Sequence, residues 1–431
     1  MHYPLFSLVT ILAVSSAASI PSSGHGSILK RGADLFSVSS NTLPLKQLAG
    51  SPSSRRRSHL NRRTSKSSGN ASLAFLQESE EFAVEAVVGK QTFLLMVDTG
   101  SSEMWVAGAG FQCEDTKGNN VSLSQCHLAN LYSRSSTFEP VPTETLFTSY
   151  AANDALFGYV GNELVSLGGI EVIQKIGVAT HGFWELASGV SGMVGLAFPS
   201  ASGIFDGAAP TDLTIPGNST NLVIHNPLFF NMIASGQLPS NVFTMILDRS
   251  AIGSSLTLGG IPAEYARAKF ATTAIFPTLS PIKGEETMTN YLYNFEVSGV
   301  SVEGKKNTTS FHAIADSGAK AIVMDSAVAL AALKAFSPPG QVSKEYGFIV
   351  NCSAAGPQLD FTIGGTTFTL DPADLILSTP VEEGICVSAI QPNDGLGGLN
   401  LFGNPFLRSL VTVYDVGSNR MHFTAKHKTS K

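Results

Sequence analysis

Two stretches in different halves of this chain share one pattern, and they constrain the fold more than any other feature. Each is an apolar run that ends in an acidic turn, Asp98-Thr99-Gly100 in the first half and Asp316-Ser317-Gly318 in the second. The glycine allows the tight turn that exposes the carboxylate, and the small hydroxyl residue can bond back to that turn. If the two halves are duplicates of each other, each supplies one carboxylate, and the two carboxylates face each other across a pseudo-twofold axis. Two facing carboxylates can act as a general acid and a general base, so the repeat indicates an enzyme.

The length and composition agree with a duplicated, sheet-rich protein. At 431 residues the chain exceeds one hydrophobic core, which favours two core-forming units plus processed segments. Charged residues make up only 14 % of the chain, whereas Gly and Phe are abundant, and this favours sheets and turns over charged surface helices. We therefore predict a mostly β fold of two lobes, 70–248 and 249–431, with the hinge between them near 246–255.

The first 69 residues have the composition of targeting and processing segments. Residues 1–18 combine a short polar start, an apolar stretch and small residues before a cut site, which predicts a signal peptide. Residues 19–69 are Ser-rich and basic, and we predict that they are the removable pro-segment of a zymogen. A buried core helix and a basic arm for anionic partners are the respective alternatives. Secretion is the predicted destination, with the vacuole as the alternative.

Charge and cysteine usage exclude several classes of function. The net charge is -6, and the basic clusters fall in the predicted pro-segment, so the acidic remainder argues against nucleic-acid binding. Four cysteines in a secreted chain are most simply two disulfides, and order and spacing favour Cys113 with Cys126 and Cys352 with Cys386. The His residues are scattered and no Cys-x-x-Cys occurs, so we predict neither a metal nor a cofactor. Asn-x-Ser/Thr sequons, which permit N-glycosylation in a eukaryote, are at Asn70, Asn120, Asn218, Asn307 and Asn351.

Apolar runs predict strands around both acidic turns. The runs within 82–97 are split by Gly89-Lys90, a hairpin pattern that leads into the first turn. Residues 150–169 contain another hairpin-like pattern. Residues 192–196 are a predicted buried strand whose glycines let another backbone approach closely, and its apolar-apolar-Gly element recurs at 401–403.

Few helices are expected. Asn226 is a predicted N-cap, with Pro227 at the first helical position of a helix that ends at Gly236. Residues 325–336 are rich in Ala and Leu and stop before a Pro-Pro-Gly sequence, which predicts a second helix.

The two facing carboxylates would share one proton. At about 3 Å apart they would repel each other by roughly 5 kcal/mol at an effective dielectric constant near 20. The pair would therefore keep a single proton across a wide acidic range. The ionised member can draw a proton from a bridging water, while the protonated member donates to a scissile carbonyl and stabilises the developing oxyanion. Such chemistry needs no covalent intermediate.

Several motifs between residues 72 and 425 together resemble those of the pepsin-like aspartic proteases. They are 98–106 (DTGSSEMWV), 192–198 (GMVGLAF), 258–261 (LGGI), 316–318 (DSG) and 401–408 (LFGNPFLR). The resemblance implies a bilobal β fold with a substrate cleft between the lobes, a signal peptide and pro-segment, and endopeptidase activity at acidic pH. It implies a secreted, monomeric member of fungal type that cleaves polypeptides and binds pepstatin-type inhibitors.

The same resemblance assigns roles to residues of the two turns. Asp98 and Asp316 would be the catalytic pair. Ser101 would hydrogen-bond the first carboxylate, and Gly100 and Gly318 would lie at the substrate-binding site.

Tyr150 falls where the family has its flap tyrosine. The resemblance implies a hairpin that closes over the peptide, with the phenol of Tyr150 bonded to the indole of Trp105 so that it shields the water. The family's flap usually continues Tyr-Gly-x-Gly, whereas this chain has Ala151-Ala152-Asn153. Losing those glycines would stiffen or reshape the flap tip. The alternative is that Tyr150 is an ordinary half-buried strand residue.

The second turn departs from the family at Ala319 and Lys320. Ala319 removes a hydroxyl that would bond the outer oxygen of Asp316, which predicts a higher pH optimum because that carboxylate ionises less readily. An ammonium within about 4–6 Å of the pair would favour its doubly ionised state. We expect Lys320 to point along the cleft wall instead, where it favours acidic substrate side chains. Glu103, where the family often has Asn, either pairs with a nearby cation or is a solvated turn residue.

Two other classes of function explain the sequence less well. A pepsin-fold homologue that binds peptides or proteins with impaired catalysis is the main alternative, motivated by the altered flap and the altered second turn. A glycosidase needs two carboxyls roughly 5–9 Å apart in a sugar cleft lined with aromatics. The chain has only two Trp, and both aspartates lie in matched turns, so an aspartic endopeptidase is the leading prediction.

Overall fold

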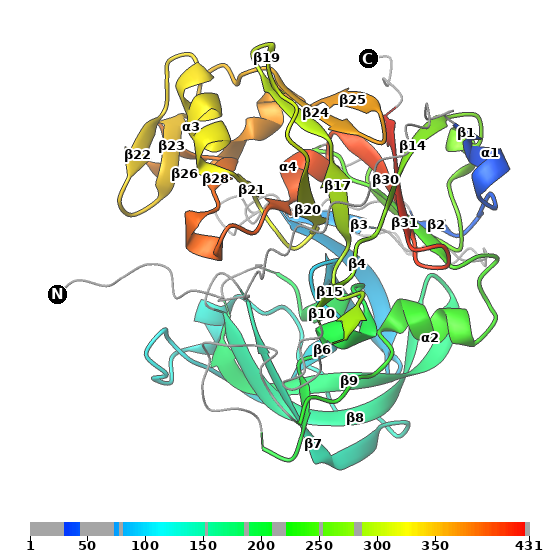
Figure 1. Ribbon diagram of the computed structural model, residues 1–431. Coiled ribbons are helices and arrows are strands. Elements are labelled where there is room, and N and C mark those ends of the chain that lie inside the picture. Colours follow the sequence, from blue (N-terminus) through cyan, green and yellow to red (C-terminus); the bar gives the residue numbers. More distant parts are fainter. Residues whose placement is uncertain are drawn as a thin grey trace, which may run out of the picture.

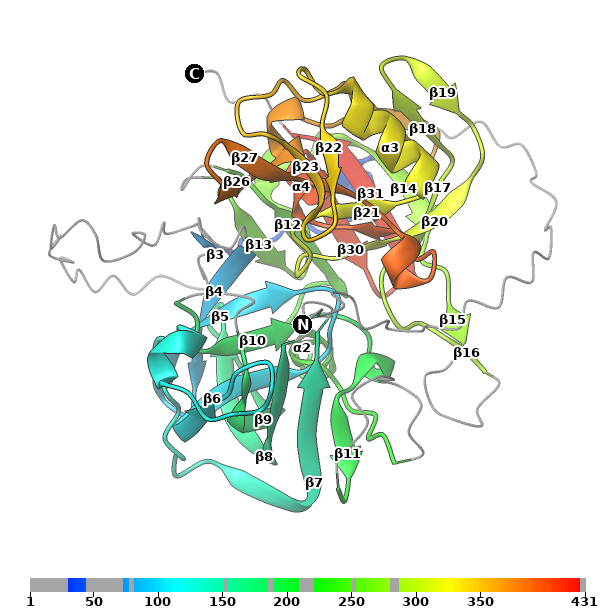
Figure 2. The same ribbon diagram turned by 90° about the vertical axis from the view of Figure 1, so that its left-hand side faces the viewer.

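The structure is a computed structural model that describes residues 30–43, 73–76, 81–150, 154–184, 189–208, 221–249, 253–279 and 287–426. Strands dominate these residues, which confirms the predicted mostly β fold. The N-terminal half of the chain, in cyan and green, and the C-terminal half, in yellow to red, form two lobes (Figure 1). Figure 2 shows them from the side, with β7, β8 and β9 in the lower lobe and α3 and β22 in the upper lobe. The predicted signal peptide lies outside the described residues, as does most of the predicted pro-segment.

A nine-stranded sheet forms the N-terminal lobe, in the order β11-β7-β8-β9-β6-β10-β5-β4-β3. β4 and β5 pair antiparallel around Gly89 and Lys90, whose φ angles of 54° and 69° make a tight turn. The hairpin predicted within 82–97 is thus confirmed. The bounds of the strands are β3 (Leu73–Leu76), β4 (Glu81–Val88), β5 (Gln91–Asp98), β6 (Met104–Cys113), β7 (Glu139–Ser149), β8 (Ala155–Leu167), β9 (Ile170–Phe183), β10 (Gly192–Gly195) and β11 (Ile204–Asp206).

Residues 150–169 do not form a hairpin of their own, so that prediction was wrong. Most of the stretch is the single long strand β8, which pairs with β7 on one side and β9 on the other. The glycines inside it mark close packing rather than a turn, because a Cβ atom at Gly158 would collide with the carbonyl group of Val178.

The C-terminal lobe contains smaller sheets. A five-stranded sheet has the order β17-β20-β29-β21-β28, two four-stranded sheets have the orders β19-β18-β24-β25 and β22-β23-β27-β26, and β15 pairs with β16. The bounds are β15 (Thr278–Leu279), β16 (Met288–Thr289), β17 (Asn294–Val297), β18 (Gly299–Val302), β19 (Lys305–Asn307), β20 (Phe311–Ala315), β21 (Ile322–Met324), β22 (Gln341–Ser343), β23 (Gly347–Asn351), β24 (Leu359–Ile363), β25 (Thr366–Thr369), β26 (Ile376–Glu382), β27 (Ile385–Ser388), β28 (Ile390–Pro392) and β29 (Leu401–Phe402).

A seven-stranded sheet has the order β1-β14-β31-β30-β12-β13-β2. Its two edge strands, β1 and β2, come from the predicted pro-segment. The lobe boundary that we place at 248/249 falls between β12 and β13, which pair in this sheet. The bounds are β1 (Lys30–Arg31), β2 (Thr42–Leu43), β12 (Val242–Ile246), β13 (Ser255–Leu258), β14 (Lys269–Ala274), β30 (Leu410–Asp415) and β31 (Arg420–Ala425).

Phe36 anchors residues 30–43 to this sheet. Its ring is only 7 % exposed and packs edge-on against Phe270 and His422, with ring centroids 5.5 Å and 4.7 Å away. Further along the segment, the Ser39 hydroxyl donates to a carbonyl of β13 at 2.7 Å. The segment is therefore packed into the C-terminal half of the molecule, where Figure 1 shows it in blue.

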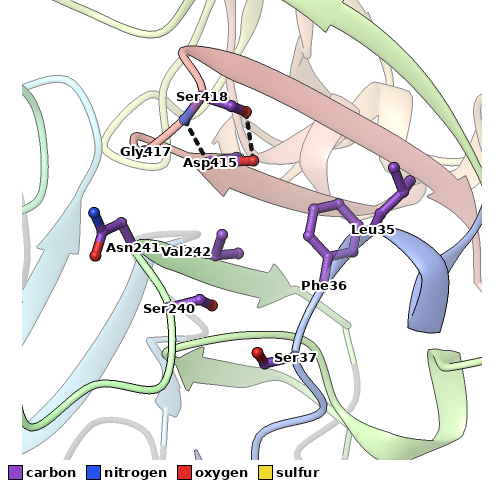
Figure 3. Close-up of a pocket in the computed structure, with 9 residues that line it drawn as sticks. All are labelled: Leu35, Phe36, Ser37, Ser240, Asn241, Val242, Asp415, Gly417 and Ser418. Carbon is purple, nitrogen blue, oxygen red and sulfur yellow. Dashed lines mark hydrogen bonds between the residues drawn. The ribbon is translucent and has the colours of Figure 1, made fainter.

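The same segment forms one side of a pocket of about 390 Å³. Figure 3 shows Phe36 and Ser37 facing this space, with Asn241 and the turn at Asp415 around it. The turn is held by Ser418, whose backbone N–H donates to Oδ1 of Asp415 at 2.9 Å. The pocket is a product of the docking of the N-terminal segment and is separate from the two acidic turns.

Both predicted helices are present, with one correction. The first is α2 (Leu228–Ala234), and its N-cap is Pro227 rather than Asn226, because Pro227 has an extended conformation with a ψ angle of 164°. The second is α3 (Ser326–Ala335), whose N-cap carboxylate, Asp325, accepts hydrogen bonds from the first turn of the helix. The other α-helices of the described residues are α1 (Gly32–Leu35) and α4 (Asn404–Leu407).

The sequence repeat corresponds to a repeated substructure. β10 pairs parallel with β5, so that Gly195 lies opposite Asp98. β29 likewise pairs parallel with β20, and Phe402 lies opposite Ala315, the residue before the second aspartate. Each acidic turn thus follows a strand that is flanked by its apolar-apolar-Gly partner.

Both predicted disulfides are confirmed. Cys113 is bonded to Cys126, and Cys352 is bonded to Cys386. Each closes a loop within one half of the chain. The shorter loop, between Cys113 and Cys126, has about 14 residues and gains roughly 3 kcal/mol of stability from closure in the chain-entropy model.

Candidate active site

The structure brings the two predicted aspartates together. Asp98 is the last residue of β5, and Asp316 directly follows β20. A Cβ atom added to Gly100 would lie 2.6 Å from Cγ of Asp316, and one added to Gly318 would lie 2.5 Å from Oδ1 of Asp98. Each glycine therefore leaves the space that the opposite carboxyl occupies. The two carboxyl groups thus lie close together between the two turns.

Four buried hydrogen bonds tie the two turns together. The backbone N–H of Thr99 donates to Oγ of Ser317 at 3.0 Å, and that of Ser317 donates to Oγ1 of Thr99 at 2.9 Å. The Thr99 hydroxyl donates to the carbonyl of Ala315, and the Ser317 hydroxyl to that of Val97, each at 2.9 Å. We expected these hydroxyls to bond within their own turns. They cross instead, because the pseudo-twofold arrangement places each hydroxyl beside the opposite strand end.

The two carboxyls have different surroundings. Asp98 accepts hydrogen bonds from a backbone N–H of its own turn at 2.7 Å and from the Ser101 hydroxyl at 2.5 Å. Asp316 accepts one from the N–H of Gly318 at 2.8 Å, and Ala319 offers no hydroxyl. Burial, followed by the charge of Asp98, raises the pKa of Asp316 well above its ordinary value. These surroundings disfavour the ionised form of Asp316.

Tyr150 and Trp105 are in contact. The indole N–H of Trp105 donates to the hydroxyl of Tyr150 at 2.8 Å. Both rings pack edge-on against Trp184, at centroid distances of 4.9 Å for Trp105 and 5.9 Å for Tyr150. Burial raises the pKa of Tyr150, and the charge of Asp98 adds to this effect, so the phenol lies within electrostatic reach of Asp98. The predicted change at the flap tip concerns 151–153, which lie outside the described residues.

Replacing Tyr150 by Phe should reduce kcat/KM for a peptide substrate about tenfold, since the buried indole N–H of Trp105 loses its acceptor. The matched control is Tyr159→Phe in β8, because the Tyr159 ring packs on Phe138 away from the two turns. Steady-state kinetics on all three proteins gives the measurement. A Tyr150→Phe enzyme with the wild-type kcat/KM would contradict a role for this contact.

Glu103 is a buried carboxyl next to the first turn, and only 2 % of it is exposed. It is not a solvated turn residue, because its neighbours are the hydroxyls of Ser102 and Ser202 and the backbone N–H of Gly203. Burial raises its pKa to about 7. Glu103 is therefore protonated at acidic pH.

This carboxyl should make the folded state more stable at acidic pH. Because its pKa rises from 4.5 to about 7, the stabilisation is complete below pH 4.5 and is lost as the pH rises through about 7. This difference corresponds to about 3 kcal/mol. Between pH 4 and pH 7, the free energy of unfolding in urea should fall by about 3 kcal/mol less in Glu103→Gln than in the wild type. The exposed Glu139 provides a control in Glu139→Gln. Equal falls in Glu103→Gln and the wild type would contradict the prediction.

One functional candidate, Glu81, was missed in the sequence. Glu81 begins β4 and is fully buried, and it accepts a hydrogen bond from the amide of Asn404 at 3.3 Å. The positive charge of Lys320 acts on this carboxyl, a partner that we did not expect for the lysine. A buried-strand pattern that begins with an acidic residue was the signal that could have drawn attention to Glu81.

The described residues give no support for a metal site or for a membrane-spanning helix. No group of three or more His, Cys, Asp or Glu among the described residues could hold a metal ion. No helix in this part of the chain is both long and apolar enough to cross a membrane.

The sequence of this chain is similar to those of known aspartic proteases. The sequence model of the family "Eukaryotic aspartyl protease" matches residues 81–426. A protein of Aspergillus fumigatus named "Probable aspartic-type endopeptidase" is 32% identical over 83% of this chain and 81% of its own length. Penicillopepsin-1 of Penicillium janthinellum is 24% identical over 83% of this chain and 98% of its own. Vacuolar protease A of Aspergillus fumigatus is 28% identical over 76% of this chain and 74% of its own.

These matches span both lobes and both acidic turns. The chain belongs to the eukaryotic aspartyl protease family. It is a peptidase of the aspartic endopeptidase class, and its substrates are polypeptides.

Proposed function

We propose that this protein is a secreted endopeptidase that hydrolyses peptide bonds at acidic pH with a water molecule activated between Asp98 and Asp316. The observation that carries the proposal is the contact between the two carboxyls, each in the space left by the glycine of the opposite turn. The raised pKa of Asp316 supports operation at acidic pH, where the pair retains one proton.

The reaction divides between the two carboxyls. Asp98, as carboxylate, takes a proton from the water while the water oxygen bonds to the scissile carbonyl carbon. Asp316 gives its proton to the carbonyl oxygen, so the tetrahedral intermediate forms without a build-up of charge. When the C–N bond breaks, the proton on Asp98 passes to the leaving nitrogen, and Asp316 regains a proton from the intermediate.

The surrounding residues position these groups. The crossed hydrogen bonds of Thr99 and Ser317 hold the carboxyls at one separation, and Ser101 holds one oxygen of Asp98. Tyr150, at the end of the hairpin between β7 and β8, would close over the bound peptide and exclude bulk water.

The cellular location is part of the proposal. The predicted signal peptide supports secretion, with the vacuole as the alternative destination, and the predicted pro-segment would make the chain a zymogen. Exposed sequons support glycosylation, and those among the described residues are at Asn120, Asn307 and Asn351.

The test is hydrolysis of a denatured protein substrate between pH 3 and pH 6, with and without pepstatin. We expect cleavage that pepstatin abolishes. A peptide-binding homologue with impaired catalysis would bind pepstatin without turnover, and that result would overturn the proposal. The glycosidase alternative is not supported, because the chain matches the eukaryotic aspartyl protease family over residues 81–426.

A further inference from the structure

Residues 30–43, here called the strap, contact the C-terminal half of the molecule at both ends and in the middle. The first strand of the strap, β1, pairs antiparallel with β14, and the second, β2, pairs antiparallel with β13. These pairings lie at opposite edges of the seven-stranded sheet. Between them, the backbone N–H of Ser39 donates to the carbonyl of Ile261 at 2.9 Å, and that of Ile261 donates to the carbonyl of Ser37 at 3.1 Å. The strap therefore joins the two edges of one sheet.

Two side chains of the strap are buried in the body of the protein. Phe36 is 7 % exposed and belongs to the same apolar cluster as Ile261 and Phe270. Ser39 is 3 % exposed, and its hydroxyl donates to the carbonyl of Leu258 at 2.7 Å. Release of the strap would open the apolar cluster to water and break this buried hydrogen bond.

The body of the protein leaves room for the strap at Gly260. A Cβ atom added there would lie 2.2 Å from the carbonyl oxygen of Ser37 and 3.2 Å from Cβ of Ser39. The first of these separations is far below van der Waals contact, so the two backbones approach this closely only because residue 260 is a glycine. The strap and the surface beneath it are therefore complementary in shape.

The strap is not at the active site. Its partners named above belong to β13, to β14 and to the connection between them, whereas Asp98 ends β5 and Asp316 follows β20. Basic sequences that suit proteolytic processing follow the strap in the chain, Arg55-Arg56-Arg57 and Arg62-Arg63. A cut at these arginines would break the covalent link between strap and body and none of the contacts described above.

We propose that the strap stays bound to the mature enzyme as a separate short chain after the precursor has been cut at the arginines. The mature enzyme is then two chains, a short one that forms both edges of the seven-stranded sheet and a long one that carries both aspartates. The proposal depends on the predicted cleavage of the precursor and not on the chemistry proposed for the aspartates. Its test therefore measures binding rather than turnover.

The test cuts the folded full-length chain once, at a recognition sequence for a site-specific protease inserted after Ser58, between the two arginine clusters. Gel filtration in about 1 M NaCl, where charge attraction is screened, separates free from bound fragment, and mass spectrometry identifies it. The N-terminal fragment should co-elute with the body and leave it only in denaturant. Over a dilution series, Phe36→Ala should weaken binding of the fragment by about a hundredfold or more. The control is Val38→Ala, which removes a side chain that is 47 % exposed and should change binding by less than about threefold.

Several outcomes overturn the proposal. A wild-type fragment that elutes apart from the body does so, whether the sheet edges stay open or the new chain end takes the place of the strap. A Phe36→Ala fragment that binds as tightly as the wild type also does so, because other residues would then hold it. If Phe36→Ala does not fold before the cut, Ser39→Ala decides instead: binding weakened about tenfold supports the proposal, and unchanged binding overturns it. A chain without pepstatin-sensitive turnover would contradict the proposed function alone.

Discussion

Replacing Asp98 or Asp316 by Asn is expected to reduce kcat/KM for a peptide substrate at pH 4 by about a thousandfold or more. Asn keeps the shape of the side chain but cannot carry the charge that accepts a proton from water. At Asp316 it also lacks the acidic proton that the carbonyl oxygen requires. Each variant removes one half of a coupled pair, so the double variant should be no less active than the weaker single variant.

The measurement is steady-state cleavage of a synthetic peptide, with Asp325→Asn as the matched control. Asp325 is the exposed N-cap of α3, and Asn caps a helix as well as Asp does, so this variant should keep wild-type activity. Thermal unfolding should show that both active-site variants fold, because the hydrogen bonds between Thr99 and Ser317 do not involve the carboxyls. Turnover retained in either active-site variant would contradict the assignment of the pair.

The acidic pair and its strands could be predicted because their signals are local and occur twice. An apolar run before each Asp-Thr/Ser-Gly turn predicts a buried strand that ends at a carboxylate. The parallel pairing of β5 with β10 and of β20 with β29 shows that the repeated sequence elements form the same structure in each half. The disulfides also follow from order and spacing, since each closes a loop within one half.

The remainder of the site depends on contacts between residues far apart in the chain. The local sequence around Thr99 and Ser317 does not reveal whether their hydroxyls bond within their own turn or to the opposite one. In the structure, both donate to the opposite half. The burial of Glu103 and of Glu81 is set by neighbours from other elements, such as Gly203 and Asn404. A single sequence does not show which residues of one half lie next to which residues of the other. The partners of these hydroxyls and carboxyls could therefore not be predicted from it.

Residues 30–43 are packed against the sheet although the average composition of the surrounding segment does not predict this. Residues 19–69 are polar and basic as a whole, which predicts a removable pro-segment. Within them, Phe36 is buried against Phe270 and His422, and β1 and β2 pair with β14 and β13 as the two edge strands of the seven-stranded sheet. Pairing at the edges covers backbone groups that would otherwise be open to other chains. If the segment is removed on maturation, as predicted, the mature protein loses these strand pairings and the contacts of Phe36.

Replacing Phe36 by Ala should therefore lower the free energy of unfolding of the full-length chain by about 4 kcal/mol, the usual cost of deleting a buried aromatic ring. Val38 provides the control in the same segment: its side chain is 47 % exposed, so Val38→Ala should change stability by less than about 0.5 kcal/mol. Urea unfolding of both variants at one pH gives the comparison. Equal midpoints for Phe36→Ala and the wild type would mean that the segment is not docked in solution. A large loss in the full-length chain, together with no difference after the segment has been cut away, would show that the contact belongs to the precursor.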